Sequence, residues 1–221
     1  MHTYVFDAYG TLFDVHAAIA RYRSAAGPEA DKLSEIWRTK QLEYTWTLTL
    51  AGRYADFWTL TERALDYALA RVPSVDRALR PRLLEAYLSL DAYPDAAATL
   101  AGLKARRANL AILSNGSPRM LDAAVSAAGL TALFDAVLSV DTVRAYKPRR
   151  EVYALATERF RVEPEQIVFV SSNRWDVMGA ACFGFRPLWV NRTRAPDEYA
   201  DAAPLREISD LAAIGEVALG G

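Results

Sequence analysis

The sequence is poor in the residues that build the commonest covalent and metal-dependent sites. It has one cysteine, Cys182, and two histidines, His2 and His16, among 221 residues. A single cysteine excludes a disulfide within the chain and argues against a cysteine-based zinc site. His2 stands at the terminus, so a Ser-His-Asp triad could in practice use only His16, and the sequence contains no Gly-x-Ser-x-Gly motif.

Long apolar runs and an excess of one charge are lacking as well. No apolar run approaches the ~18 residues that a membrane span needs. The formal net charge is −1, which provides no basic surface for nucleic acid. Strand-like residues begin almost at the first position and leave no room for a signal peptide. We therefore expect a soluble, cytoplasmic protein that binds neither membranes nor nucleic acid.

The first segment that is clearly present is a short apolar strand followed by an aspartate. Tyr4 to Phe6 are apolar and β-prone, Asp7 ends the run, and the chain turns at Gly10. Open α/β sheets bind their ligands in a crevice at the carboxyl ends of the strands. If the chain forms such a sheet, Asp7 lies at its crevice.

Strands and helices alternate through the second half of the chain. The patterns predict strands over 109–114, 136–140, 167–171 and 187–191, and helices over 95–107, 118–128, 150–160 and 176–184. Such alternation is typical of a doubly wound, mostly parallel sheet. The predicted fold class is therefore α/β with a Rossmann-like core.

Residues 15–91 contain no predicted strand. Their spacing of apolar residues predicts helices over 33–51, 54–72 and 77–90. Connections in α/β sheets are normally short, so a stretch of this length between the first two strands indicates an insertion. We expect a catalytic core of residues 1–14 and 92–221 and a helical cap of residues 15–91 that lies over the crevice.

Polar clusters follow four of the predicted strands. They are Asp7, Ser114 with Asn115, Lys147, and the segment 171–176. Each cluster alone could be a turn, a helix cap or a solvated side chain. Together, at one edge of a parallel sheet, they bring carboxylates, hydroxyls and an ammonium into one place, which is the composition of a nucleophilic site.

These clusters also carry a family resemblance. Asp7 to Thr11, Ser114-Asn115, Lys147-Pro148 and Asp176 resemble the four motifs of the haloacid dehalogenase superfamily, and the likeness spans essentially the whole chain. Phe6 to Val15, Trp37 to Trp46, and Ser171 to Asn173 followed by Trp175-Asp176 resemble the L-2-haloacid dehalogenases in particular. The cap segment is the most specific of these matches, because caps differ widely within the superfamily.

One position separates the dehalogenases from the phosphatases of that superfamily. The phosphatases have an aspartate two residues after the nucleophile, which protonates the leaving group and helps to hold magnesium, whereas this chain has Tyr9. Asp7 and Asp176 alone are a poor magnesium site. A halide leaves without a general acid, so the resemblance implies cleavage of a carbon–halogen bond with no metal and no cofactor.

The resemblance implies a two-step mechanism with named residues. Asp7 attacks C2 of an (S)-2-haloacid, expels halide and forms an ester, which water then hydrolyses to the (R)-2-hydroxyacid. Lys147 is expected to hold Asp7 ionised, and Asp176 to orient Lys147 and help activate water, although Lys147 could itself take more of that second role. The remaining catalytic residues, which should hydrogen-bond Asp7 or the developing oxyanion, are Thr11, Ser171 and Asn173.

Other residues are expected to bind the substrate and the halide. Ser114 and Asn115 would hold the substrate carboxylate, and Arg38 would accept the halide with help from Asn115. The remaining residues of this set are Tyr9, at an exposed place in the crevice, with Phe57 and Trp175 as apolar walls, and Tyr153 in the Lys147 cluster. The plainer interpretations are a surface ion pair of Arg38 with Glu35 or Glu43, and simple packing for Phe57 and Trp175.

Two alternative functions remain open for the chain, and the resemblance also bears on its assembly. The chain could be a magnesium-dependent phosphohydrolase of the same superfamily, or a relative that binds ligands without catalysis. The resemblance also implies a homodimer, for which the predicted helix over 33–51 offers an apolar surface.

Overall fold

The computed structural model describes residues 2–216 and contains a six-stranded sheet in which every pairing is parallel. The strand order is β3-β2-β1-β4-β5-β6. The strands are β1 (Thr3–Phe6), β2 (Asn109–Ser114), β3 (Ala136–Ser139), β4 (Ile167–Ser171), β5 (Arg186–Val190) and β6 (Arg206–Ile208). The predicted α/β fold class is thereby confirmed.

The first strand occupies the middle of the sheet. All four residues of β1 are buried, and β1 pairs with β2 on one side and with β4 on the other. A strand covered on both faces reads as a continuous apolar run, which is why Tyr4 to Phe6 stood out in the sequence. The sequence patterns predicted 187–191 as the last of the strands, and this was wrong, because β6 follows it. Only Ile208 of β6 is buried, so its sequence carried little apolar signal.

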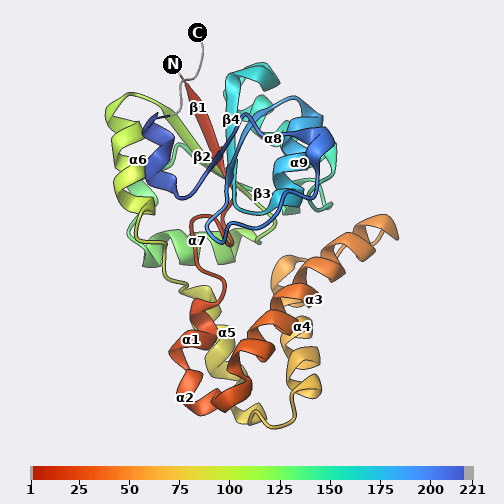
Figure 1. Ribbon diagram of the computed structural model, residues 1–221. Helices are drawn as coiled ribbons and strands as arrows, with labels where there is room; N and C mark the ends of the chain where they lie inside the picture. Colours follow the sequence, from red (N-terminus) through yellow and green to blue (C-terminus); the bar gives the residue numbers. More distant parts are fainter. Residues whose placement is uncertain (1, 217–221) are drawn as a thin grey trace.

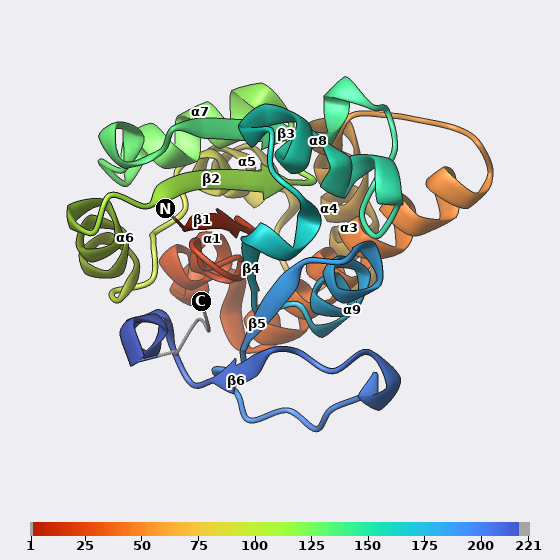
Figure 2. The same cartoon turned by 90° about the horizontal axis from the view of Figure 1, so that it is seen from above.

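Helices cover both faces of the sheet (Figures 1 and 2). They are α6 (Ala96–Ala105), α7 (Pro118–Ala127), α8 (Arg150–Phe160) and α9 (Arg174–Phe183). Both views place α6 on the opposite side of the sheet from α8 and α9. This is the doubly wound arrangement, and α9 begins two residues earlier than predicted, at Arg174.

The segment between β1 and β2 is helical. Its helices, which we call the cap helices, are α1 (Ala17–Arg21), α2 (Arg23–Ala26), α3 (Ala30–Leu50), α4 (Phe57–Arg71) and α5 (Arg80–Leu88). Figure 1 shows them together below the sheet, with the end of α3 reaching out beside it. Among residues 2–216, no helix has both the length and the apolar character needed to cross a membrane.

The cap helices are tied to the sheet at two places. Where the chain leaves and returns, the Asp14 amide donates to Asp91 O at 2.9 Å and the Tyr93 amide to Leu12 O at 2.8 Å. At the second place, the Tyr146 hydroxyl donates to Ala55 O at 2.6 Å. Both ties lie near the carboxyl ends of the strands, so α3 and α4 are held over the edge at which Asp7 lies.

Candidate active site

Asp7 lies directly after β1 and accepts hydrogen bonds from three side chains. Its amide donates to Val170 O at 2.9 Å, which continues the ladder to β4 by one residue. Lys147 Nζ lies 3.0 Å from Oδ1. Oδ2 accepts from Thr11 Oγ1 at 3.0 Å and from Asn173 Nδ2 at 2.8 Å. These bonds orient the carboxylate in a site where only 5% of the residue is exposed.

Lys147 is fully buried between two carboxylates. Its Nζ lies 2.7 Å from Asp176 Oδ2, and Asp176 Oδ1 accepts from the Tyr153 hydroxyl at 2.8 Å. Burial opposes the lysine charge, but Asp176 and Asp7 outweigh it and raise the pKa of Lys147. Burial raises the pKa of Asp176 to about 6 against the pull of Lys147, and the charge of Asp7 acts in the same direction as burial.

The residues at this place do not fit magnesium. The ammonium of Lys147 already contacts both Asp7 and Asp176, so a divalent ion between these carboxylates would face a positive charge. Within residues 2–216, no group of three or more His, Cys, Asp or Glu side chains is arranged to hold a metal ion. Magnesium usually takes one or two carboxylates together with water and phosphate oxygens. Here the cation beside the two carboxylates is the protein's own lysine.

The polar contacts around Asp7 differ in part from the prediction. Thr11 and Asn173 bond Asp7 as expected. Ser171 does not, because its Oγ accepts from the Asn173 amide at 3.1 Å. The adjacent Ser172, which the sequence analysis missed, donates its amide to Thr11 Oγ1 at 2.9 Å and its hydroxyl to Gly10 O. Successive residues of a strand point to opposite faces, so the sequence pattern could not tell which of two neighbouring serines faces the site.

A small cavity opens beside Asp7, and we call it the reaction cavity. Its lining residues come from the sheet edge and from the cap helices: Asp7, Tyr9, Arg38, Leu42, Phe57, Ser114, Asn115, Asn173 and Trp175. All of them except Leu42 belong to the predicted site set. Leu42 lies four residues after Arg38 on α3 and therefore on the same helix face. That spacing was visible in the sequence and could have identified it.

Arg38 reaches the reaction cavity from α3. Its Nη2 donates to Tyr9 O at 3.2 Å. Among the described residues it has no acidic partner within ion-pair distance, and Glu43 pairs instead with Lys40 at 2.7 Å. The interpretation of Arg38 as half of a surface ion pair is therefore wrong. A guanidinium with unused donors beside a closed cavity is suited to bind an anion.

The aromatic wall of the reaction cavity is more buried than expected. Tyr9 is only 3% exposed, so the expectation of an exposed position was wrong. Its ring stacks on Tyr87 at 5.7 Å and lies 5.9 Å from the ring of Phe57. A Cβ on Gly116 would come within 2.7 Å of the Tyr9 ring, so this packing requires glycine there. The rings of Tyr9 and Phe57 form the aromatic wall of the reaction cavity, and Tyr87 packs behind Tyr9.

Asn115 and Tyr153 occupy distinct positions around Lys147. Asn115 Oδ1 accepts from the Lys147 amide at 3.1 Å, which leaves its Nδ2, a donor, without a partner among the described residues and on a side chain that lines the cavity. Tyr153 was placed with the substrate-binding residues, but it is not among the residues that line the cavity. Its contact is with Asp176, so it holds the carboxylate that holds Lys147.

Comparison with known proteins shows the family to which the chain is similar. The family model for haloacid dehalogenase-like hydrolases matches residues 1–184. The chain is 48% identical to (S)-2-haloacid dehalogenase 1 of a Pseudomonas species over 97% of its own length and 95% of the relative. It is 49% identical to (S)-2-haloacid dehalogenase 4A of Burkholderia cepacia over 91% and 87%. The structure of L-2-haloacid dehalogenase from Xanthobacter autotrophicus with covalently bound chloropropionic acid aligns with a TM-score of 0.89 at 40% identity, covering 100% of this chain and 99% of that one.

Proposed function

The chain belongs to the haloacid dehalogenase-like hydrolases, and from that premise we propose that it converts (S)-2-haloacids to (R)-2-hydroxyacids and halide. The observation that carries this proposal is Asp7 itself, which is held by Lys147, Thr11 and Asn173 at the wall of a closed cavity into which Arg38 projects. A nucleophilic carboxylate and an anion-binding guanidinium that line the same small cavity suit the displacement of a halide.

The first step is an in-line displacement at C2. Oδ2 of Asp7 already accepts two hydrogen bonds, whereas Oδ1 accepts one, from Lys147, so Oδ1 has the greater freedom to attack. Its electron pair forms the new C–O bond while the C–X pair leaves with the halide toward Arg38. Ser114 and the unpartnered Nδ2 of Asn115 are placed to hold the substrate carboxylate. One displacement inverts C2 and converts S to R.

The second step is hydrolysis of the ester on Asp7. Water adds to the ester's carbonyl carbon, so negative charge develops on Oδ2, and Thr11 and Asn173 already donate to that oxygen. They therefore act as the oxyanion hole, with Ser172 fixing Thr11. Collapse of the adduct breaks the bond between the Asp7 carboxyl carbon and the ester oxygen, which leaves with the hydroxyacid and its new configuration intact. One proton of the water goes to that oxygen and the other to solvent, and the Asp7 carboxylate is restored.

Asp176 is best assigned as a positioning residue. Both of its oxygens are engaged, by Lys147 and Tyr153, and it does not line the reaction cavity. Its contact with Lys147 keeps the ammonium directed at Asp7. Ser171 acts in the same indirect way, through the Asn173 amide. The water that attacks the ester is held by groups that reach the cavity or the Asp7 carboxylate. Lys147 contacts Asp7 at 3.0 Å, and because its raised pKa keeps it an ammonium, it can orient and polarise that water but does not take a proton from it.

The ionisation of Asp176 should appear in the pH dependence of the reaction. Because its pKa is raised to about 6, lowering the pH through that value neutralises Asp176 and weakens its hold on Lys147. Halide release should therefore fall on the acid side near pH 6. It should persist well into the alkaline range, because the pKa of Lys147 is raised rather than lowered. A kcat profile with no change between pH 5 and 8 would contradict this assignment.

Replacing Arg38 should reduce turnover without unfolding the protein. Arg38→Ala removes the anion-binding guanidinium, and we expect kcat/KM to fall by about 10²-fold or more, as when one transition-state donor is removed. Arg38→Lys should recover only part of this loss, since an ammonium lacks the planar fork. Arg53→Ala, on an exposed residue of the loop after α3, is the matched control. Unchanged kinetics of Arg38→Ala would remove Arg38 from the site.

The deciding experiment is a halide-release assay in EDTA. We expect (S)-2-chloropropionate to yield chloride and (R)-lactate with the chelator present, because Lys147 supplies the positive charge beside both carboxylates. Magnesium-dependent hydrolysis of p-nitrophenyl phosphate, abolished by EDTA, would instead identify a phosphohydrolase. Failure to release halide from any (S)-2-haloacid, with no phosphatase activity, would favour a non-catalytic relative.

We also propose that the protein is a homodimer and acts in the cytoplasm. Leu50, at the end of α3, is 87% exposed, and Figure 1 shows this end extending past the other cap helices. A large exposed apolar side chain on a projecting helix suits burial against a second copy. Sedimentation velocity of the wild type and of Leu50→Glu tests the dimer. The single cysteine suits a reducing compartment, and cell fractionation tests that location.

A further inference from the structure

The reaction cavity adjoins a larger hollow, which we call the vestibule. The vestibule is lined by the turn at Gly10, by α3, by the start of α9 and by the loop over residues 190–198. It shares four lining residues with the reaction cavity: Arg38, Leu42, Asn173 and Trp175. The two spaces are therefore separated by a wall that is one side chain thick.

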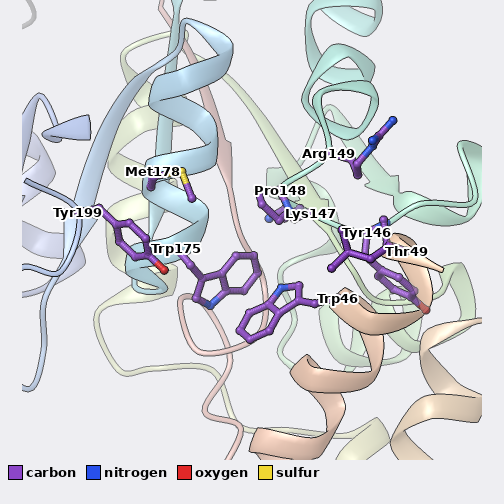
Figure 3. Close-up of a pocket in the computed structure, with 10 residues that line it drawn as sticks. Trp46, Thr49, Tyr146, Lys147, Pro148, Arg149, Trp175, Met178 and Tyr199 are labelled. Carbon is purple, nitrogen blue, oxygen red and sulfur yellow. The ribbon is translucent and has the colours of Figure 1, made fainter. Parts of the chain in front are cut away.

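A second hollow, which we call the apolar groove, lies on the other side of Trp175. Figure 3 shows its lining, in which Trp46 and Trp175 lie near one another. Met178 and Tyr199 lie to one side of them, and the residues to the other side are Thr49, Tyr146, Lys147, Pro148 and Arg149. Leu50 completes the lining. The groove shares only Trp175 with the reaction cavity. Two paths to Asp7 are therefore conceivable, and their chemistry differs.

The vestibule suits a carboxylate better than the groove does. Three of its lining residues are arginines, Arg38, Arg174 and Arg192, against one carboxylate, Glu198. Arg174 and Arg192 are paired with Asp197 and Asp95, whereas Arg38, which lies where the two spaces meet, has no ion pair among the described residues. The groove lining also contains two cations, but both are already paired, Lys147 with Asp7 and Asp176 and Arg149 with Glu151. The rest of that lining is mostly apolar, so a carboxylate there would lose its water without gaining an unpaired cation.

The shared wall contains both fixed and movable side chains. Asn173 is held by its bond to Asp7 Oδ2, and Arg38 by its bond to Tyr9 O. Leu42 is apolar, and the Trp175 indole makes no hydrogen bond within the described residues. Trp175 contacts the Trp46 ring edge-on, with centroids 5.5 Å apart and planes at 81°. Packing alone therefore holds the side chains of Leu42 and Trp175. Rotation of these two side chains would join the vestibule to the reaction cavity.

We propose that the vestibule is the path by which the haloacid anion reaches Asp7, passing Arg38 between Leu42 and Trp175. The proposal rests on the proposed function for the identity of the anion. It assigns the loop over residues 190–198 a direct influence on substrate capture, although no residue of that loop lines the reaction cavity.

The test places the same charge at the mouth of each path. Thr193 lies in the exposed part of the vestibule lining, and Met178 lines only the groove. Thr193→Glu should lower kcat/KM for (S)-2-chloropropionate about threefold or more at roughly 0.1 M ionic strength, and Thr193→Lys should raise it. Both effects should vanish near 1 M salt, where the Debye length is about 3 Å. Met178→Glu and Met178→Lys should change kcat/KM by less than about twofold, and kcat should stay constant throughout.

A steric variant gives an independent measurement. Thr193→Trp should lower kcat/KM more for longer 2-haloacids than for 2-chloropropionate, and Met178→Trp should not. Effects on the Met178 variants alone, or equal effects at both positions, would overturn the proposal. So would the absence of any effect at Thr193 in a protein whose wild type releases halide. A wild type that releases no halide would instead overturn the proposed function.

Discussion

Asp7→Asn is expected to abolish halide release, by a factor on the order of 10⁴ or more, because Asp7 is the only carboxylate among the described residues that line the reaction cavity. An amide oxygen is a far weaker nucleophile, and an amide nitrogen beside Lys147 would reverse the local polarity. The protein should stay folded, since the change keeps the side chain's shape and removes one of two buried negative charges that share a single lysine.

The role of Asp7 as the nucleophile can also be measured directly, by detecting the ester intermediate. Rapid quenching of the wild type with excess (S)-2-haloacid should leave an adduct on the peptide that contains Asp7, and Asp7→Asn should leave none. In a single turnover in heavy-oxygen water, the label should enter Asp7 and not the hydroxyacid, because water attacks the ester's carbonyl carbon. An adduct on any other residue, or label in the product after one turnover, would refute Asp7 as the nucleophile.

Lys147→Met should cost both activity and stability. The change leaves the Asp7 and Asp176 carboxylates buried without a cation, and breaking a buried pair in this way costs about 3–5 kcal/mol of unfolding free energy. Halide release should be lost as well, since Asp7 would lose the cation that contacts Oδ1 and holds the carboxylate in place. Lys104→Met is the matched control, because its partly exposed pair with Asp135, at 2.8 Å, should contribute about 1 kcal/mol or less.

The stability loss of Lys147→Met should become smaller as the pH is lowered. Burial already raises the pKa of Asp176 against the pull of Lys147, and without the lysine that opposing pull is lost, so the folded variant binds more protons than the unfolded chain. Its unfolding free energy should therefore increase as the pH is lowered from 7 toward 5. Adding Asp176→Asn should restore part of the loss at pH 7. Urea unfolding at both pH values measures this, and a loss below about 1 kcal/mol at pH 7 would show that the cluster is not tightly coupled.

Much of the fold could be predicted because it follows from local patterns. An apolar run in a parallel strand is buried on both faces, and strands that alternate with helices must pair in parallel. The strands over 109–114 and 167–171 and the helix over 150–160 have the predicted limits. Strand β6 was missed because its two exposed residues gave it no such pattern.

The candidate site, like the fold, could be predicted only in part. That Asp7, Ser114, Lys147 and Asp176 would meet was determined by the sequence, because the carboxyl ends of parallel strands lie at one edge of a sheet. The choice of chemistry also came from sequence, through Tyr9 at the position two residues beyond the nucleophile.

Only the tertiary structure decided how those side chains pair. It directed Ser171 to a backbone amide and brought Ser172 to Thr11, and it placed Tyr153 behind Asp176 instead of at the substrate. It also set Lys147 between two carboxylates and left Arg38 without an acidic partner among the described residues. The reason is that a local pattern specifies on which element a residue lies, whereas hydrogen bonds and ion pairs depend on ångström-scale distances that the fold sets, even for groups 161 residues apart such as those of Thr11 and Ser172.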